Sequence, residues 1–128
     1  MQITTEELDH VELIAIKGRV DSVEAARLEE ALAAASRRGR YKLVIDMSQL
    51  EYMSSAGFRA LAAAQRNSQR QSRGEVVLTQ VPTQVHEALE LVGFTEYFKI
   101  IDPPASALEY AEKLHAGIST PDVEPPSA

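Results

Sequence analysis

Two adjacent serines stand where a strand-like segment gives way to a predicted helix, in the stretch MSSAGF at residues 53–58. A serine just before a helix commonly accepts a hydrogen bond from an unpaired backbone amide, which stabilises the helix by about 1 kcal/mol. One serine is enough for this cap. The second hydroxyl then stands beside Ala56 and Gly57, which have almost no side chain to shield it. Such a hydroxyl can serve as a docking point or accept a phosphoryl group.

The start of a helix also favours negative charge. Its unpaired N–H groups and its dipole stabilise an exposed anion by roughly 0.3–1 kcal/mol. A phosphoserine adds about −1.5 to −2 units of charge, which disrupts a partner packed on the same surface. Phosphorylation of Ser54 or Ser55 can therefore switch binding without disturbing the fold.

The sequence gives little support for catalysis or for a bound metal. It contains no cysteine, no glycine-rich phosphate loop and no Gly-x-Ser-x-Gly motif. The three histidines, His10, His86 and His115, share no metal-ligand spacing and are interpreted as surface residues. A nucleophilic Ser54 or Ser55 activated by a distant histidine is possible in principle, but no motif supports it. We expect a protein that is not an enzyme, with no catalytic residue, cofactor or metal.

A basic stripe is predicted on the helix that follows the serines. Arg66, Arg70 and Arg73 are spaced at i, i+4 and i+7, so they share one helix face. This face could dock an acidic partner. Charged stripes on helices usually face solvent, and we favour that interpretation.

Length and composition indicate one globular domain. The chain has 128 residues, 45% of them hydrophobic and 25% charged, with a formal net charge of −6. The acidic balance argues against direct nucleic-acid binding. The first residues lack the features of a signal peptide, and no apolar run approaches the roughly 20 residues of a membrane helix. We therefore expect a cytoplasmic protein without membrane insertion.

Hydrophobic periodicity predicts strands and helices in the order β-β-α-β-α-β-α-β-α. Strands at residues 3–8 and 11–18 are separated by a short polar turn, so they should form an antiparallel hairpin. Later strand–helix–strand units require parallel neighbours. We expect an α/β domain at residues 1–116, with about four helices packed on a mixed sheet of four to five strands. The proline-rich residues 117–128 are expected to form a disordered tail.

Two helix boundaries carry specific signals. The helix that starts at Ser55 is expected to run to Arg73 and to end at Gly74 in a left-handed conformation. Asp102 followed by Pro103 predicts the start of the last helix, with the carboxylate as its cap.

Three segments of the chain follow one another in a specific order: IKGRVDSVEAARLEEAL, LVIDMSQLEYMSSAGFRALAAA and VVLTQVPTQVHEALELVGFTEYFKI. Together with the strand order, they resemble the STAS domains over roughly residues 3–115, and within that family the bacterial anti-sigma factor antagonists. The resemblance implies a STAS fold, a mixed sheet flanked by helices. It also implies a binding protein whose partner is an anti-sigma factor that is itself an ATP-using serine kinase. That kinase would phosphorylate a loop serine and release the antagonist, and a separate phosphatase would reset it.

The resemblance assigns the phosphorylated position to Ser55, which lies two residues before Gly57. Ser54 is the second choice, because it stands where many members have aspartate, while Ala56 stands where many have a second serine. The remaining implied partner-binding residues are close to this position or on the segment around Asp21. The complete set is Asp21, Ser22, Met53, Ser54, Ser55, Ala56, Gly57 and Phe58.

Two further aspartates have structural interpretations. Asp21 matches a family aspartate near the phosphoserine, and it could equally be the N-cap of the first helix, a role compatible with the first. Asp46 and Ser48 match the family's step after a strand and are interpreted as hydrogen-bonding residues that shape the loop.

A second function keeps the same fold but has no switch. The chain would then be a constitutive STAS subunit of an ABC-type lipid-transport complex and would use the same helix end for docking. Co-purification of a kinase or of a transporter ATPase would distinguish the two functions.

Overall fold

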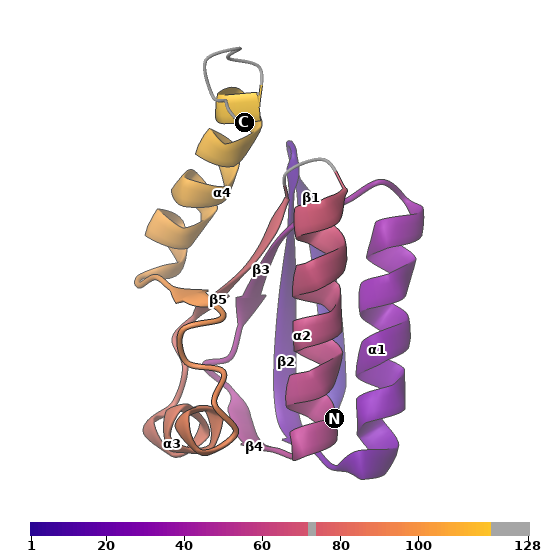
Figure 1. The fold of residues 1–128 in the computed structure, drawn as a ribbon, viewed down its shortest axis with the longest axis vertical. Helices are drawn as coiled ribbons and strands as arrows, with labels where there is room; N and C mark the ends of the chain where they lie inside the picture. Colours follow the sequence, from indigo (N-terminus) through magenta and orange to yellow (C-terminus); the bar gives the residue numbers. More distant parts are fainter. Residues whose placement is uncertain (72–73, 119–128) are drawn as a thin grey trace.

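The computed structural model describes residues 1–71 and 74–118, except for the side chains of residues 115–118 (Figure 1). It confirms the predicted alternation of strands and helices. The described elements, in chain order, are β1 (Gln2–Leu8), β2 (Val11–Val20), α1 (Ser22–Arg37), β3 (Lys42–Asp46), β4 (Leu50–Met53), α2 (Ser55–Arg70), β5 (Glu75–Thr79), α3 (Thr83–Leu91), β6 (Lys99–Ile100) and α4 (Pro104–Ile118). Most of the predicted tail, residues 119–128, lies outside the described residues, and α4 continues to Ile118.

Six strands of the described chain form one mixed sheet in the order β1-β2-β3-β5-β6, with β4 beside β2. The hairpin of β1 and β2 is antiparallel as predicted, and the other strand pairs are parallel. The short β4 is additional to the strands expected from the sequence. Its four residues are buried only at the ends, Leu50 and Met53, so they lack the alternation typical of a strand. The strand forms because β2 extends past the end of β3, and Val20 pairs with Met53.

The helices cover the two faces of the sheet unequally. Helices α1 and α2 lie side by side on one face, and α4 covers part of the other (Figure 1). The larger core lies under α1 and α2, and the smaller one lies under α4. The apolar stripe of α1 is confirmed by its buried residues Ala25, Leu28, Leu32 and Ala35.

Gly74 is required for close packing and does not take the predicted left-handed conformation. α2 ends at Arg70, earlier than expected, and Gly74 does not have a positive φ. A Cβ atom on Gly74 would lie 2.1 Å from the carbonyl oxygen of Tyr41. A glycine after a helix can supply a left-handed backbone conformation, or it can leave room where a Cβ atom would clash. The prediction was wrong because the sequence does not distinguish these two roles. Arg73 lies outside the described residues.

Asp102 does not cap the last helix, contrary to the prediction. Its carboxylate accepts hydrogen bonds from the Thr79 hydroxyl at 3.1 Å and from the Gln80 amide at 2.6 Å, and α4 begins at Pro104. Gln80 follows β5 and has a φ of 56°, so the chain turns at this residue as it leaves the sheet. The carboxylate satisfies that amide and thereby ties the end of β5 to the approach to α4.

Candidate functional site

The two long helices begin next to each other at one end of the sheet, the lower end in Figure 1. β2 ends at Val20 and β4 ends at Met53, and these two residues are paired in the sheet. The next amide, that of Ser54, donates a hydrogen bond to the Val20 carbonyl oxygen at 2.8 Å. This pairing brings the first residues of α1 and α2 together. We call residues 21–23 and 54–56 the paired helix starts.

The structure gives the two serines different environments. Ser54 is the N-cap of α2, with extended backbone (φ −76°, ψ 167°), and its hydroxyl accepts a hydrogen bond from the Gly57 amide at 3.3 Å. Ser54 is also partly buried. Ser55 is the first helical residue and is exposed. The hydroxyl free for chemistry or docking is therefore that of Ser55.

The residues on either side of the serines form the support beneath them. Met53, Gly57 and Phe58 are buried, and Ala56 is partly buried. A Cβ atom on Gly57 would lie 2.5 Å from Met53 Cγ and 3.2 Å from Val20 Cγ1. Gly57 therefore allows α2 to approach the sheet closely, in contrast to the interpretation that it leaves Ser55 unshielded. Any contact of these buried residues with a partner stays a prediction.

The start of α1 supplies the other half of the surface. Asp21 is the N-cap, and its Oδ1 accepts a hydrogen bond from the Glu24 amide at 2.8 Å, which confirms the capping interpretation. Asp21 and Ser22 are exposed, so both remain accessible to a partner. Val23 is 79% exposed and was not predicted from the sequence as part of this surface. The available signal was an apolar residue that lies off the buried stripe of α1.

Asp46 shapes the loop that leads to β4, as interpreted from the sequence. Its Oδ1 accepts a hydrogen bond from the Ser48 amide at 2.9 Å. This is an Asx-type turn, which fixes the chain as it leaves β3. Ser48 takes part through its backbone N–H.

A shallow hollow of about 320 Å³ lies between the first turns of the two helices. Arg59 contributes to its wall from α2, and Glu29 contributes from α1. Arg59 follows Ser55 by four residues and is exposed. Arg59 was not predicted from the sequence as part of the site, although its spacing from Ser55 was the available signal. The other residues lining this hollow are Ser22, Ala25, Ala26, Ala56 and Ala60.

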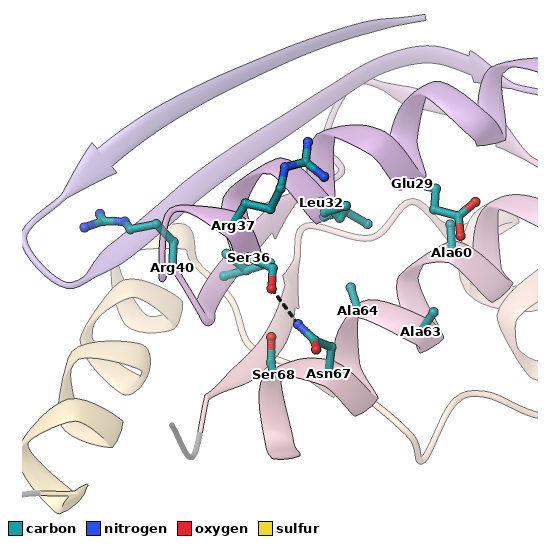
Figure 2. A pocket seen from close by; sticks show the side chains of 12 residues that line it. Glu29, Leu32, Ser36, Arg37, Arg40, Ala60, Ala63, Ala64, Asn67 and Ser68 are labelled. Atoms are coloured by element: carbon teal, nitrogen blue, oxygen red, sulfur yellow. Dashed lines mark hydrogen bonds between the residues drawn. The ribbon is translucent and has the colours of Figure 1, made fainter. Parts of the chain in front are cut away.

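A second hollow of about 290 Å³ lies farther along the same two helices (Figure 2). The Asn67 side-chain amide donates a hydrogen bond to the Ser36 hydroxyl at 2.8 Å, which joins α2 to α1 beside it. The ionisable residues of its lining are Glu29, Arg37 and Arg40, and the lining includes no histidine. This set provides neither a nucleophile–base pair nor a metal-ligand cluster.

The hydrogen bonds of His10 join the hairpin turn to α4. The His10 amide donates a hydrogen bond to Glu112 Oε2 at 3.0 Å, and its ring lies 3.3 Å from Oε1 of the same residue. His86 lies on α3, and the side chain of His115 lies outside the described residues. Over the described part of the chain, no group of three or more histidine, aspartate or glutamate side chains is arranged to hold a metal ion. Arg66 and Arg70 are exposed on α2.

Two ionisable groups with shifted pKa values lie on the α4 side of the sheet. Burial lowers the pKa of Lys42. Burial, together with a 2.6 Å hydrogen bond to Glu75, raises the pKa of Tyr110. Both belong to the packing of α4 and neither is part of the paired helix starts. Within residues 1–71 and 74–118, no helix is long and apolar enough to cross a membrane.

Comparison with known proteins places the chain in a family. The family model described as "Mlab, STAS domain" matches residues 3–102, and the chain belongs to the STAS domain family. BtrV of Bordetella bronchiseptica, named as a candidate anti-sigma factor antagonist, is 33% identical over 107 residues. The match covers 84% of this chain and 91% of BtrV.

Two mycobacterial proteins show the same relationship. The anti-sigma-F factor antagonist RsfB of Mycobacterium tuberculosis is 31% identical over 108 residues, which cover 83% of this chain and 87% of RsfB. The crystal structure of an anti-sigma factor antagonist from Mycobacterium paratuberculosis has a TM-score of 0.75 and 26% identity. That match covers 87% of this chain and 93% of the other. The STAS fold implied by the sequence resemblance is confirmed.

Proposed function

We propose that this chain is an anti-sigma factor antagonist in a partner-switching circuit, and that phosphorylation of Ser55 switches its binding off. The observation that carries the proposal is the division of roles between two neighbouring serines. Ser54 caps α2, while Ser55 is exposed at the first helical position. The names of the relatives supply the class of partner, an anti-sigma factor.

In the proposed circuit the anti-sigma factor is also a serine kinase that uses ATP. The Ser55 hydroxyl oxygen attacks the γ-phosphorus of ATP, the bond from that phosphorus to the bridging oxygen breaks, and ADP leaves. The hydroxyl proton passes to a base of the kinase. A separate phosphatase hydrolyses the phosphoserine and restores binding. Because ATP is the phosphoryl donor, we place the circuit in the cytoplasm, and it needs neither nucleic-acid binding nor membrane insertion by this chain.

The electrostatics of α2 favour such a switch. Its first turn contains no acidic side chain, so a phosphate at residue 55 meets the positive end of the helix without a competing carboxylate from that turn. A partner packed against Asp21, Ser22 and Ala56 would instead have to bury the new charge. Since about 1.4 kcal/mol corresponds to a tenfold change in affinity, even a modest mismatch releases the partner. Met53, Gly57 and Phe58 hold this surface from beneath.

The first prediction concerns the modified residue. Incubation with the cognate kinase and ATP should add one phosphoryl group at Ser55, mapped by mass spectrometry. Ser55→Ala should abolish modification and keep partner binding, because an alanine adds no charge. Ser55→Asp should weaken binding at least tenfold, measured by calorimetry.

Ser54→Ala is the matched control. It should still be phosphorylated at Ser55, and its free energy of unfolding should fall by about 1 kcal/mol through loss of the cap. Modification at Ser54 in the wild type, or unchanged binding by Ser55→Asp, would contradict the assignment.

A constitutive STAS subunit of an ABC-type lipid-transport complex is the second candidate function. The observation that favours it is the description of the matching family model, which carries the name Mlab. This function predicts co-purification with a transporter ATPase and no modification of Ser55 in the native host. Co-purification with a soluble kinase would count against it.

A further inference from the structure

Arg59 is placed to reach a phosphate on Ser55. Residues four apart on a helix lie on the same face, with Cβ atoms about 5–6 Å apart. Both Ser55 and Arg59 belong to α2, and both are exposed. The arginine side chain is long enough to bring its guanidinium group to a phosphate on the preceding turn, where it can form two parallel hydrogen bonds.

Arg59 is also available for this role. On α1 and just after it, Arg27 pairs with Glu24, Arg37 pairs with Glu30 and Arg38 pairs with Glu12. No such ion pair or hydrogen bond is found for the Arg59 side chain among the described residues. Instead it faces the hollow between the first turns of α1 and α2.

The carboxylates of α1 would repel a phosphate on Ser55, so a nearby cation would stabilise that phosphate. Asp21 is exposed at the start of α1, and Glu29 lines the hollow across from Arg59. The Asp21 carboxylate is held as a cap by the Glu24 amide, so it stays at the helix start. A phosphate at Ser55 would therefore add negative charge close to the acidic start of α1, and a neighbouring guanidinium would offset the repulsion.

We propose that Arg59 is the internal counter-ion of the switch, and that it binds the phosphate on Ser55 and holds it against the surface of α2. This inference deepens the proposed function and rests on it. Phosphorylation then has two effects on the docking surface: it adds an anion, and it removes a free cation. Arg59 is a positioning residue, since it acts on the phosphate after transfer and takes no part in the chemical step.

The test uses the full chain with phosphoserine incorporated at position 55 during translation, so no kinase is needed. Phosphorus NMR follows the second ionisation of the phosphate, which has a pKa near 6 in unperturbed phosphoserine. A nearby guanidinium favours the dianion and lowers this pKa. Arg59→Gln should therefore raise it by about half a unit relative to the wild-type background, and Arg59→Lys should raise it by less.

Two matched controls accompany this measurement. Arg66→Gln removes an exposed arginine from the same helix two turns farther on and should leave the phosphate pKa unchanged. Glu29→Gln removes a carboxylate from the lining of the same hollow and should not raise the phosphate pKa. The unphosphorylated Arg59→Gln chain should keep the wild-type midpoint of thermal unfolding, because the replaced side chain is exposed.

The outcomes separate the inference from the proposed function. An identical phosphate titration for Arg59→Gln and the wild-type background overturns the role of Arg59, as does an equal shift caused by Arg66→Gln. Failure of the kinase to modify Ser55 counts against the proposed function and leaves this titration unaffected, since the phosphate is built in.

Discussion

At the scale of single residues, Gly57 determines how α2 meets the sheet. The glycine lies under the first turn of α2, where a Cβ atom would come within 2.5 Å of the Met53 side chain. This close approach places Ser54 as the cap of α2 and leaves Ser55, the next residue, exposed. The orientation of Ser55 therefore depends on a residue that need not touch any partner.

Gly57→Ala should lower the free energy of unfolding by about 1–2 kcal/mol, since overpacking outweighs the better helix propensity of alanine. Urea unfolding measures this change. The same substitution in a Met53→Ala background should cost less, because the side chain that it meets has been shortened. A Gly57→Ala chain as stable as the wild type would contradict the packing role.

The sequence was sufficient to place a cap and a free hydroxyl at the serines, because helix starts have strong local preferences. The sequence did not show whether Gly57 leaves Ser55 unshielded or allows α2 to pack closely on the sheet. That distinction depends on Met53 and Val20, which reach the glycine only through the pairing of β2 with β4.

At the scale of elements, α4 packs on the sheet through small side chains. Its described fully buried residues are the small side chains Ala107 and Ala111. The hydrogen bond from the Tyr110 hydroxyl to Glu75 and the contact between Glu112 and His10 add polar attachments to β5 and to the hairpin. The attachment of α4 should therefore respond to pH.

The pKa of Tyr110 is raised by burial and then by its hydrogen bond to Glu75. A raised pKa in the folded state means that its stabilising contribution is complete below pH of about 10, the ordinary tyrosine value, and is lost as the pH rises above it. Urea unfolding between pH 8 and about 11.5 should show this loss in the wild type and not in Tyr110→Phe.

Lys42 acts in the opposite direction, because burial lowers its pKa and the folded state gains stability as the lysine loses its proton. Comparing wild type and Tyr110→Phe at each pH removes this shared contribution. Parallel stability curves for the two chains above pH of about 10 would rule out the role assigned to Tyr110.

Element order could be predicted because long periodic segments carry a strong signal. The exceptions were short or depended on remote partners. β4 has four residues and forms only against the end of β2, and Asp102 bonds to Thr79 and Gln80 in place of its own helix. Both depend on which strands lie side by side, and local propensity does not contain that information.

At the scale of the whole molecule, the buried ion-pair cluster around Glu12 and the paired helix starts lie at opposite ends. Glu12 is fully buried near the C-terminal end of α1, where it pairs with Arg38 and Arg40. Arg40 also donates hydrogen bonds to the carbonyl oxygens of Asp9 and Val11 at 3.1 and 3.0 Å. This cluster joins the hairpin to the end of α1, far from the paired helix starts (Figure 1).

Glu12→Gln should lower the free energy of unfolding by about 3 kcal/mol, since it breaks a buried ion pair. Glu30→Gln, which breaks the exposed pair with Arg37, is the matched control and should cost less than about 1 kcal/mol. Chemical unfolding measures both. Below its unfolding temperature, Glu12→Gln should still accept phosphate at Ser55 at the wild-type rate. An equal fall in the free energy of unfolding for the two variants would contradict the structural role of the Glu12 cluster.

The position of the chain's first residue has a practical consequence for reporter design. Met1 packs beside Gly18, with its Cα 3.7 Å from where a Cβ on that glycine would lie, so β1 begins near the paired helix starts. α4 ends at the opposite end of the molecule (Figure 1). A fluorescent domain fused ahead of β1 would lie beside the paired helix starts and obstruct a partner that binds there. Attached beyond α4, the same label leaves that surface open and suits a binding assay.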